Sequence, residues 1–392
     1  MSTIASVTAV PFNVSPRTNW FFILVQLDDG SQAWGEASLN GWEMALHTAT
    51  QLHGQPLVGM TVEAAIAQLR PSASLPGGLV SNAVLSALAQ ALWTIRAEQD
   101  AVPLHAMLAP LQRKAISVYA NINRATVDRT PAGFAATAKR AAAAGFLGFK
   151  AAPFDGVTPG ACAAGEAEQL IRHGVDCLHA IREAVGPQAR LMVDCHWRFD
   201  EKSALEVLDQ LQAVGLHWFE CPLAETYDNW DSLRKIKAHA NEPNVLIAAA
   251  ETQVGVASFE MQIREKLLDV VMPDIKYCGG PAHMLAIAEM AAAHDILFAP
   301  HNPTGPVCTV ASLHVACVAS KAHMLELQFE ESPLYDALVG QQHPTLEKGK
   351  YHVPNRTGLG VEPDMQLIGA HPFKPVPFGI ETLLAVWLPT CN

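Results

Sequence analysis

Eight short apolar segments, each followed by a stretch with helical spacing, fill the sequence between residues 116 and 328. Short apolar runs bounded by turn residues predict buried strands, and apolar residues that recur every three to four positions predict helices. Eight alternating units predict an α/β fold, specifically a (β/α)8 TIM-type barrel. A doubly wound open sheet is the alternative, although that fold does not require eight evenly spaced units. The predicted strands cover residues 116–121, 148–152, 191–194, 217–220, 245–249, 270–274, 296–300 and 324–328. The predicted helices cover residues 131–144, 161–185, 203–214, 230–239, 258–268, 281–294 and 308–321.

The sequence on either side of this repeat predicts a second domain. Residues 4–36 have the pattern of extended strands and turns, and helical spacing follows from about residue 44 to residue 108. Strands followed by helices are typical of an α+β unit. We therefore expect an N-terminal α+β capping domain over residues 1–115, a catalytic barrel over residues 116–342, and a C-terminal segment, residues 343–392, that returns to the capping domain.

Composition limits the partners of the chain. Of its 392 residues half are hydrophobic and 16% are charged, with a formal net charge of −12. A negative chain of this kind is disfavoured as a ligand of nucleic acid or of an anionic membrane surface, so we expect a small-molecule partner. No uninterrupted apolar run approaches the roughly 20 residues of a membrane span. The eight cysteines contain no Cys-x-x-Cys spacing, and the start Met1-Ser2-Thr3-Ile4 lacks a leader pattern, which indicates a cytoplasmic protein.

Three carboxylates follow successive predicted strands. Asp194, Glu220 and Glu251 each stand where an apolar run ends. The carboxyl ends of barrel strands meet on one face, so these side chains should converge, and converging carboxylates repel one another unless a cation lies among them. Oxygen ligands with room for water suit Mg²⁺. The alternative is that each acid caps a helix or forms a salt bridge.

The ends of the sixth and seventh predicted strands carry Asp274 and His301. A carboxylate that holds one ring nitrogen of a histidine fixes its tautomer and raises its basicity, as a general base requires. We therefore expect Asp274 and His301 to form a catalytic pair. The alternative is an unrelated helix-capping acid and a structural histidine.

Further polar residues interrupt apolar strands. Lys150, in the second strand, needs a carboxylate or an oxyanion beside its ammonium group. His196 stands two residues after Asp194, so both side chains should project to the same side. The last strand offers Glu326 or Glu330, and we favour Glu330 because it lies just past the apolar run.

These residues resemble the enolase superfamily, and within it the mandelate racemase-like subgroup that includes acid-sugar dehydratases of the galactonate type. The motifs that carry the resemblance are Asp194-Cys195-His196 and the run from Pro300 to Pro306. The resemblance implies that Asp194, Glu220 and Glu251 bind Mg²⁺, that His301 and Asp274 form the base pair, and that His196 assists departure of a hydroxyl group. It also implies a symmetric homo-oligomer.

Racemases of this subgroup carry Lys-x-Lys at the second strand, whereas this chain has Lys150-Ala151-Ala152. That difference favours a dehydratase that converts a sugar acid, either an aldonate or an aldarate, to a 2-keto-3-deoxy acid through an enediolate. A racemase, an epimerase and a cycloisomerase share the first half of that reaction, and a non-catalytic metal-binding barrel is a further alternative. We expect substrate contacts from Trp20, Asn40, Trp197 and Arg198; Arg198 either binds a distal carboxylate or caps a helix on the surface.

Overall fold

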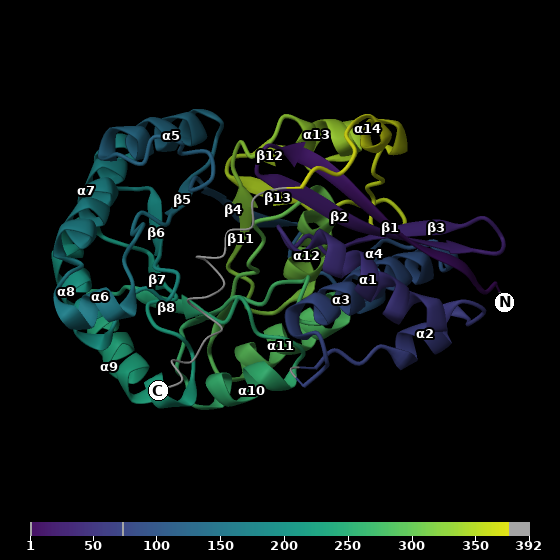
Figure 1. Ribbon diagram of the computed structural model, residues 1–392, viewed down its shortest axis with the longest axis horizontal. Coiled ribbons are helices and arrows are strands. Elements are labelled where there is room, and N and C mark those ends of the chain that lie inside the picture. Colours follow the sequence, from purple (N-terminus) through teal and green to yellow (C-terminus); the bar gives the residue numbers. More distant parts are fainter. Residues whose placement is uncertain (1, 73, 376–392) are drawn as a thin grey trace.

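The computed structural model describes residues 2–72 and 74–375, and its larger part is a closed barrel of parallel strands with helices outside (Figure 1). The strands lie side by side in chain order from β4 to β10, β11 pairs with β4, and a parallel bridge between Phe298 and Ala322 closes the ring. The predicted (β/α)8 barrel is confirmed. Its strands are β4 (Ala115–Asn121), β5 (Gly148–Ala151), β6 (Arg190–Asp194), β7 (Trp218–Glu220), β8 (Leu246–Ala249), β9 (Val270–Val271), β10 (Leu297–Phe298) and β11 (Met324–Gln328).

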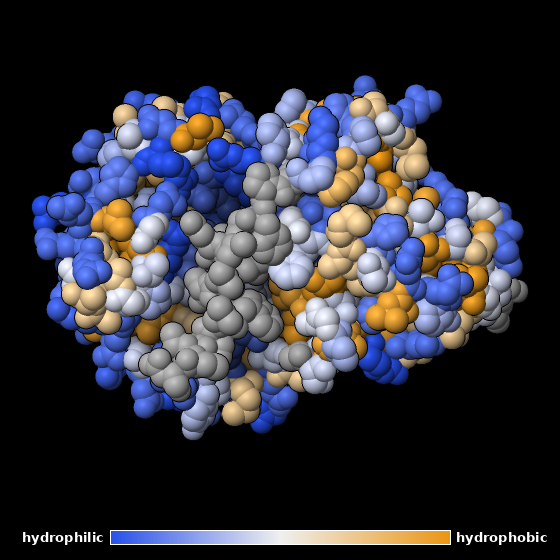
Figure 2. Space-filling view, viewed as in Figure 1, coloured by the Kyte–Doolittle hydropathy of each residue, from blue (hydrophilic) through white to orange (hydrophobic). Residues whose placement is uncertain are grey.

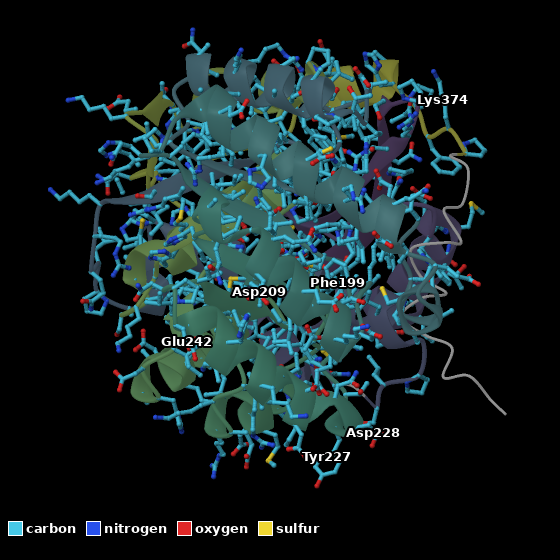
Figure 3. All side chains as sticks on the ribbon, turned by 90° about the vertical axis from the view of Figure 1, so that its left-hand side faces the viewer. Phe199, Asp209, Tyr227, Asp228, Glu242 and Lys374 are labelled. Atoms are coloured by element: carbon cyan, nitrogen blue, oxygen red, sulfur yellow. The ribbon has the colours of Figure 1, made fainter. Side chains whose placement is uncertain are left out.

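Most of the helices that surround the barrel bury one face, whereas residues 306–318 are buried on all sides and residues 159–164 include no buried residue. Phe199 is buried behind the helices on the side shown in Figure 3, whereas Tyr227 at the edge is 79% exposed. Gly165, with a φ of 72°, divides the single helix predicted over residues 161–185 into α6 and α7. The barrel helices are α5 (Pro131–Ala143), α6 (Pro159–Ala164), α7 (Glu168–Val185), α8 (Glu201–Gln210), α9 (Trp230–Asn241), α10 (Ala257–Arg264), α11 (Pro281–Ala293) and α12 (Pro306–Val318).

An antiparallel sheet covered by helices forms the N-terminal domain, on the right in Figure 1. Its strands are β1 (Ile4–Ser15), β2 (Thr18–Leu27) and β3 (Gln32–Glu36), and its helices are α1 (Glu43–Gly54), α2 (Val62–Gln68), α3 (Gly78–Gln99) and α4 (Leu104–Leu108). By length and composition α3 could cross a membrane, but 78% of its most apolar window is buried in the protein, where it packs on β2 and β3. It is therefore a core helix of this domain.

The C-terminal segment divides between the two domains. β13 (Lys350–His352) pairs antiparallel with the first residues of β4, and β12 (Leu346–Glu347) pairs with β13, so this part extends the barrel sheet. Past it, the chain returns to the N-terminal domain, because the carbonyl of Gly358 accepts from the amide of Leu104 at 2.7 Å. The expected return is thus found only for the later part. The short helices here are α13 (Leu334–Val339) and α14 (Met365–Ala370); residues 376–392 lie outside the described residues.

One buried carboxylate joins the two domains. Glu36, at the end of β3, accepts hydrogen bonds from the hydroxyl of Thr304 at 2.5 Å and from the amides of Gly305 and Cys308 at 2.8 and 3.0 Å. Those amides belong to the first turn of α12, where the helix dipole favours negative charge. A Cβ atom on Gly305 would lie 2.8 Å from the Glu36 carboxylate, so a glycine lets the carboxylate approach. The N-terminal domain therefore holds the loop that precedes α12.

We expect Glu36→Gln to lower the free energy of unfolding by about 1–3 kcal/mol, because the amide nitrogen cannot accept from the donors of α12. Urea denaturation measures the change. Glu63→Gln is the matched control, since Glu63 is 51% exposed and contacts Arg96 on the surface. Equal stabilities of the two variants would contradict the proposed role of Glu36.

Candidate functional site

Three carboxylates meet at the carboxyl ends of neighbouring barrel strands. Asp194 ends β6 and Glu220 ends β7, where the two are register partners, and Glu251 follows β8. Each offers an oxygen that lies within 4.8 Å of those of the other two, and all three residues are buried. Oε2 of Glu251 has no hydrogen-bond partner among the described residues. A buried carboxylate oxygen that accepts no hydrogen bond, beside two more carboxylates, fits a divalent cation.

The same crowding shifts the pKa values of these acids. Burial raises the pKa of Glu220 to about 8, although Lys150 opposes the shift. Burial and the charges of Asp194 and Glu220 raise the pKa of Glu251 well above its ordinary value. Burial would also raise the pKa of Asp194, but His196 and Lys150 outweigh it and lower that pKa. Two of the three acids therefore hold protons more tightly than free carboxylates, and a bound cation would displace those protons.

Lys150 lies beneath this cluster, with 1% of its side chain exposed. Its Nζ atom is 2.5 Å from Glu220 Oε1, 2.9 Å from Glu326 Oε1 and 4.0 Å from Asp194 Oδ2. Burial lowers the pKa of Lys150, but Glu220 and Glu326 outweigh it, so the ammonium stays charged. It does not line the cavity described below. Among the described residues its ion-pair partners are carboxylates, and its positive charge compensates their negative charge.

The structure places Glu326, and not the predicted Glu330, at the site. Glu326 lies inside β11 with its side chain toward the barrel interior, where it also accepts from Asn121 at 2.7 Å. Glu330 lies beyond the strand, is 46% exposed, and pairs with Arg140 of α5 at 2.9 Å. The prediction of Glu330 was wrong because it assumed that an acid must follow the apolar run. An acid inside the run is stable here because Lys150 neutralises it.

The expected contact between Asp274 and His301 is present. His301 Nδ1 is 2.9 Å from Asp274 Oδ2, and a parallel bridge joins the two residues just past β9 and β10. His301 Nε2 lies 3.4 Å from Glu251 Oε2, so the free ring nitrogen faces the carboxylate cluster. Burial would raise the pKa of Asp274, but Lys276 and His301 lower it. Asp274 is thus an ionised partner that orients His301 toward the three acids.

His196 and Trp197 lie in a tight turn, with φ values of 48° and 57°. His196 Nε2 is 2.8 Å from Asp194 Oδ2, and its side chain is 27% exposed toward the cavity. The indole nitrogen of Trp197 donates to Glu225 at 3.0 Å. Asp194 and His196 therefore lie on a shared side as predicted, but the turn after β6, and not strand alternation, brings them together.

A cavity of about 390 Å³ opens above these groups, between the barrel and the N-terminal domain. Figure 2 shows hydrophilic residues around a hollow over the barrel. Trp20 and Asn40 line the cavity as expected. Arg198 does not: its guanidinium donates to the carbonyl of Phe154 and lies 3.7 Å from Asp155, so the prediction that it contacts the substrate was wrong. The lining comprises Thr18, Asn19, Trp20, Ser38, Leu39, Asn40, Leu79, Asn121, Asn123, Arg124, Asp194, His196, Trp197, Glu251, Thr252, Lys276, Tyr277, His301, Pro303, Thr304 and Gln328.

Sequence reasoning missed two basic residues of this lining. Lys276 lies 2.8 Å from Asp274 Oδ2, and Arg124 lies 2.6 Å from Glu331. The sequence did contain a signal for Lys276. This lysine stands two residues after Asp274, which is the same spacing that separates His196 from Asp194. Arg124 follows β4 in a loop, where no periodicity indicates its direction.

We expect Lys150→Met to lower the free energy of unfolding by about 3–5 kcal/mol at pH 8, because it leaves Glu220 and Glu326 uncompensated. Without Lys150 the raised pKa of Glu220 would rise further, and the pKa of Glu326 would lose the ammonium group that lowers it. Protonated carboxyl groups need no counter-charge, so the loss should shrink as the pH falls toward 5. Chemical denaturation at several pH values measures it.

The control is Lys235→Met, which removes a lysine that is 63% exposed and pairs with Glu201 at 3.0 Å. It should change the stability by no more than about 0.5 kcal/mol at any pH. A pH-independent loss in Lys150→Met would show that packing, and not charge, is its contribution.

Comparisons with known proteins show the family and the fold of this chain. A family described as "Enolase C-terminal domain-like" matches residues 133–367. A relative from Streptomyces bingchenggensis named D-galactonate dehydratase family member is 27% identical over 383 residues, covering 92% of each chain. The D-xylonate dehydratase of Haloferax volcanii is 25% identical over 361 residues, covering 90% of this chain and 85% of its own. The structure of the 3,6-anhydro-D-galactonate cycloisomerase from Zobellia galactanivorans has the same fold, with a TM-score of 0.81 at 21% identity, covering 95% of this chain and 100% of its own.

Proposed function

The chain belongs to the enolase C-terminal domain-like family, and from that premise we propose that it is a Mg²⁺-dependent dehydratase of a sugar acid. The observation that carries the proposal is the His301–Asp274 pair, whose free nitrogen faces the three buried carboxylates. Relatives named D-galactonate and D-xylonate dehydratase support the choice of reaction. The product would be a 2-keto-3-deoxy acid.

Asp194, Glu220 and Glu251 would hold the Mg²⁺ ion. Their oxygen atoms are the ligands that Mg²⁺ prefers, and the unpaired Oε2 of Glu251 supports a cation at this position. When bound, the ion supplies positive charge that holds the substrate carboxylate and stabilises the negative charge that develops there.

His301 would act as the general base. Its Nδ1 atom bonds to the Asp274 carboxylate, so Nε2 is the nitrogen free to take the α-proton of the acid. The α-carbon must then lie beside Nε2, next to Glu251, which agrees with a substrate carboxylate held over the three acids. Removal of the proton leaves an enediolate, whose charge Lys150 helps to offset from below the cluster.

His196 would supply the proton for the leaving hydroxyl group. It lines the cavity beside Asp194, on the side of the site formed by β6, whereas His301 approaches from β10. The β-hydroxyl would leave with this proton as water, and the resulting enol would tautomerise to the keto acid. The two histidines thus have separate tasks, one accepting a proton and the other donating one.

We also propose a cytoplasmic location. The seven cysteines in the described part of the chain are unpaired, and six of them are buried. Unpaired thiols agree with a reducing compartment.

We expect the protein, with Mg²⁺ in D₂O, to convert an aldonic or aldaric acid to a 2-keto acid, measured by a colour reaction for the keto group and by NMR. His301→Asn should abolish both keto acid formation and deuterium uptake at the α-carbon, because no base remains. His239→Asn, a surface histidine 2.8 Å from Asp209, should be fully active. Deuterium uptake without keto acid would replace the dehydratase with an isomerase, and neither signal from any acid would refute catalysis of this kind.

We expect Mg²⁺ to bind more tightly as the pH rises from 6 to 8.5, because Glu220 and Glu251 must lose protons when the ion binds. The affinity should change by up to about tenfold per pH unit for each proton released. Calorimetry in two buffers of different ionisation enthalpy measures the protons directly. Glu251→Gln should weaken binding, whereas Glu242→Gln, on the exposed surface in Figure 3, should not. An affinity that does not depend on pH would contradict the assignment.

A further inference from the structure

Lys276 places a second buried ammonium group in the wall of the cavity. Its side chain is 3% exposed, and the residue lines the cavity together with Tyr277 and His301. Lys150, by contrast, lies below the carboxylates and outside the lining. Lys276 is therefore the buried lysine that a bound ligand can reach.

The hydrogen-bonding capacity of Lys276 is only partly used. An ammonium group carries three N–H donors. Among the described residues, the acceptor for Lys276 is Asp274 Oδ2 at 2.8 Å, and the ring of Tyr277 lies with its centre 5.3 Å away. Burying an N–H without an acceptor is costly, so the remaining donors call for a partner in the cavity.

Contacts between neighbouring side chains give the order in which the groups follow one another across the site. Glu251 of the carboxylate cluster lies 3.4 Å from His301 Nε2, and His301 Nδ1 lies 2.9 Å from Asp274. Asp274 in turn contacts Lys276. Moving away from the carboxylates, the base therefore comes first and Lys276 second.

A substrate placed along this line has its carboxylate at the three acids and its α-carbon at His301. The next carbons of the chain then extend toward Lys276. In a sugar acid these carbons carry hydroxyl groups, whose oxygen atoms accept hydrogen bonds.

We propose that Lys276 is a substrate-binding residue, whose ammonium group donates a hydrogen bond to a hydroxyl oxygen beyond the α-carbon while it remains paired with Asp274. The inference rests on the proposed function, because it uses the orientation that the base and the carboxylate cluster impose. Lys276 would then favour a polyhydroxy acid over an acid that lacks the contacted hydroxyl group.

The competing explanation is that Lys276 only positions Asp274 and, through it, His301. Both roles predict that Lys276→Met lowers activity, so activity with one substrate does not separate them. They differ in how the loss depends on the hydroxyl groups of the substrate. A positioning role weakens α-proton removal equally for every acid, whereas a binding role weakens it only for acids that carry the contacted hydroxyl.

The test uses the full-length protein with Mg²⁺ and the best aldonic acid from the screen above, beside its 3-deoxy, 4-deoxy and 5-deoxy analogues. The rate of α-proton exchange in D₂O gives kcat/KM for each acid, since exchange does not require a leaving group. Lys276→Met should lower kcat/KM for the parent acid by about tenfold or more, the effect of one hydrogen bond to a charged donor. For one deoxy analogue the wild type and the variant should agree within about threefold.

An equal loss for all four acids would overturn the proposal in favour of positioning. No loss for any of them would overturn both roles. Lys276→Gln, which keeps an N–H donor, should recover part of the selectivity for the parent acid. Lys237→Met is the matched control, because it removes a half-buried lysine that pairs with Asp269 at 3.0 Å far from the cavity lining. If the wild type exchanges no acid, the proposed function fails; if it exchanges them without dependence on Lys276, only the present inference fails.

Discussion

The structure depends on the balance between buried ammonium groups and buried carboxylates at the mouth of the barrel. Two buried ammonium groups, those of Lys150 and Lys276, cannot neutralise the buried acids around them. This deficit adds to burial in raising the pKa values of Glu220 and Glu251, and Lys150 offsets the rise only in part. A divalent cation would remove that deficit, so the metal site follows from electrostatics as well as from the ligand pattern. The buried acids are Asp194, Glu220, Glu251, Asp274 and Glu326.

The scaffold fixes these charges by holding the loop after β10 from two sides. The amide of Asn302, next to His301, donates to Glu326 at 3.0 Å in the barrel, and Thr304 donates to Glu36 of the N-terminal domain. A displacement of either domain would therefore move the loop that carries His301. Glu36, in the third strand of the N-terminal domain, thus contacts the same loop as Glu326 of the barrel.

Sequence alone predicted those features that repeat. The barrel strands, the three carboxylates and the pair of Asp274 and His301 each follow an apolar run, so periodicity located them. Glu326 was misplaced because its stability inside a strand depends on Lys150, a contact between residues far apart in the sequence. Arg198 was misassigned for a similar reason, since a carbonyl of a neighbouring loop holds its guanidinium. The pairing of β13 with β4 was also missed, because an edge position on a barrel has no signature in a three-residue strand.

Chemistry and selectivity come from different parts of the cavity. Its floor carries ionisable groups from strand ends, whose positions the barrel fixes, whereas its walls carry amides such as those of Asn19, Asn40 and Asn121 beside the cations Arg124 and Lys276. Neutral amides can donate and accept, which suits hydroxyl groups. Asn19 and Asn40 belong to the N-terminal domain, so in the proposed reaction that domain would contribute to recognition while the barrel would contribute the proton transfers. Substitutions in the loops of the N-terminal domain could then change the substrate without disturbing the balance of charge at the floor of the cavity.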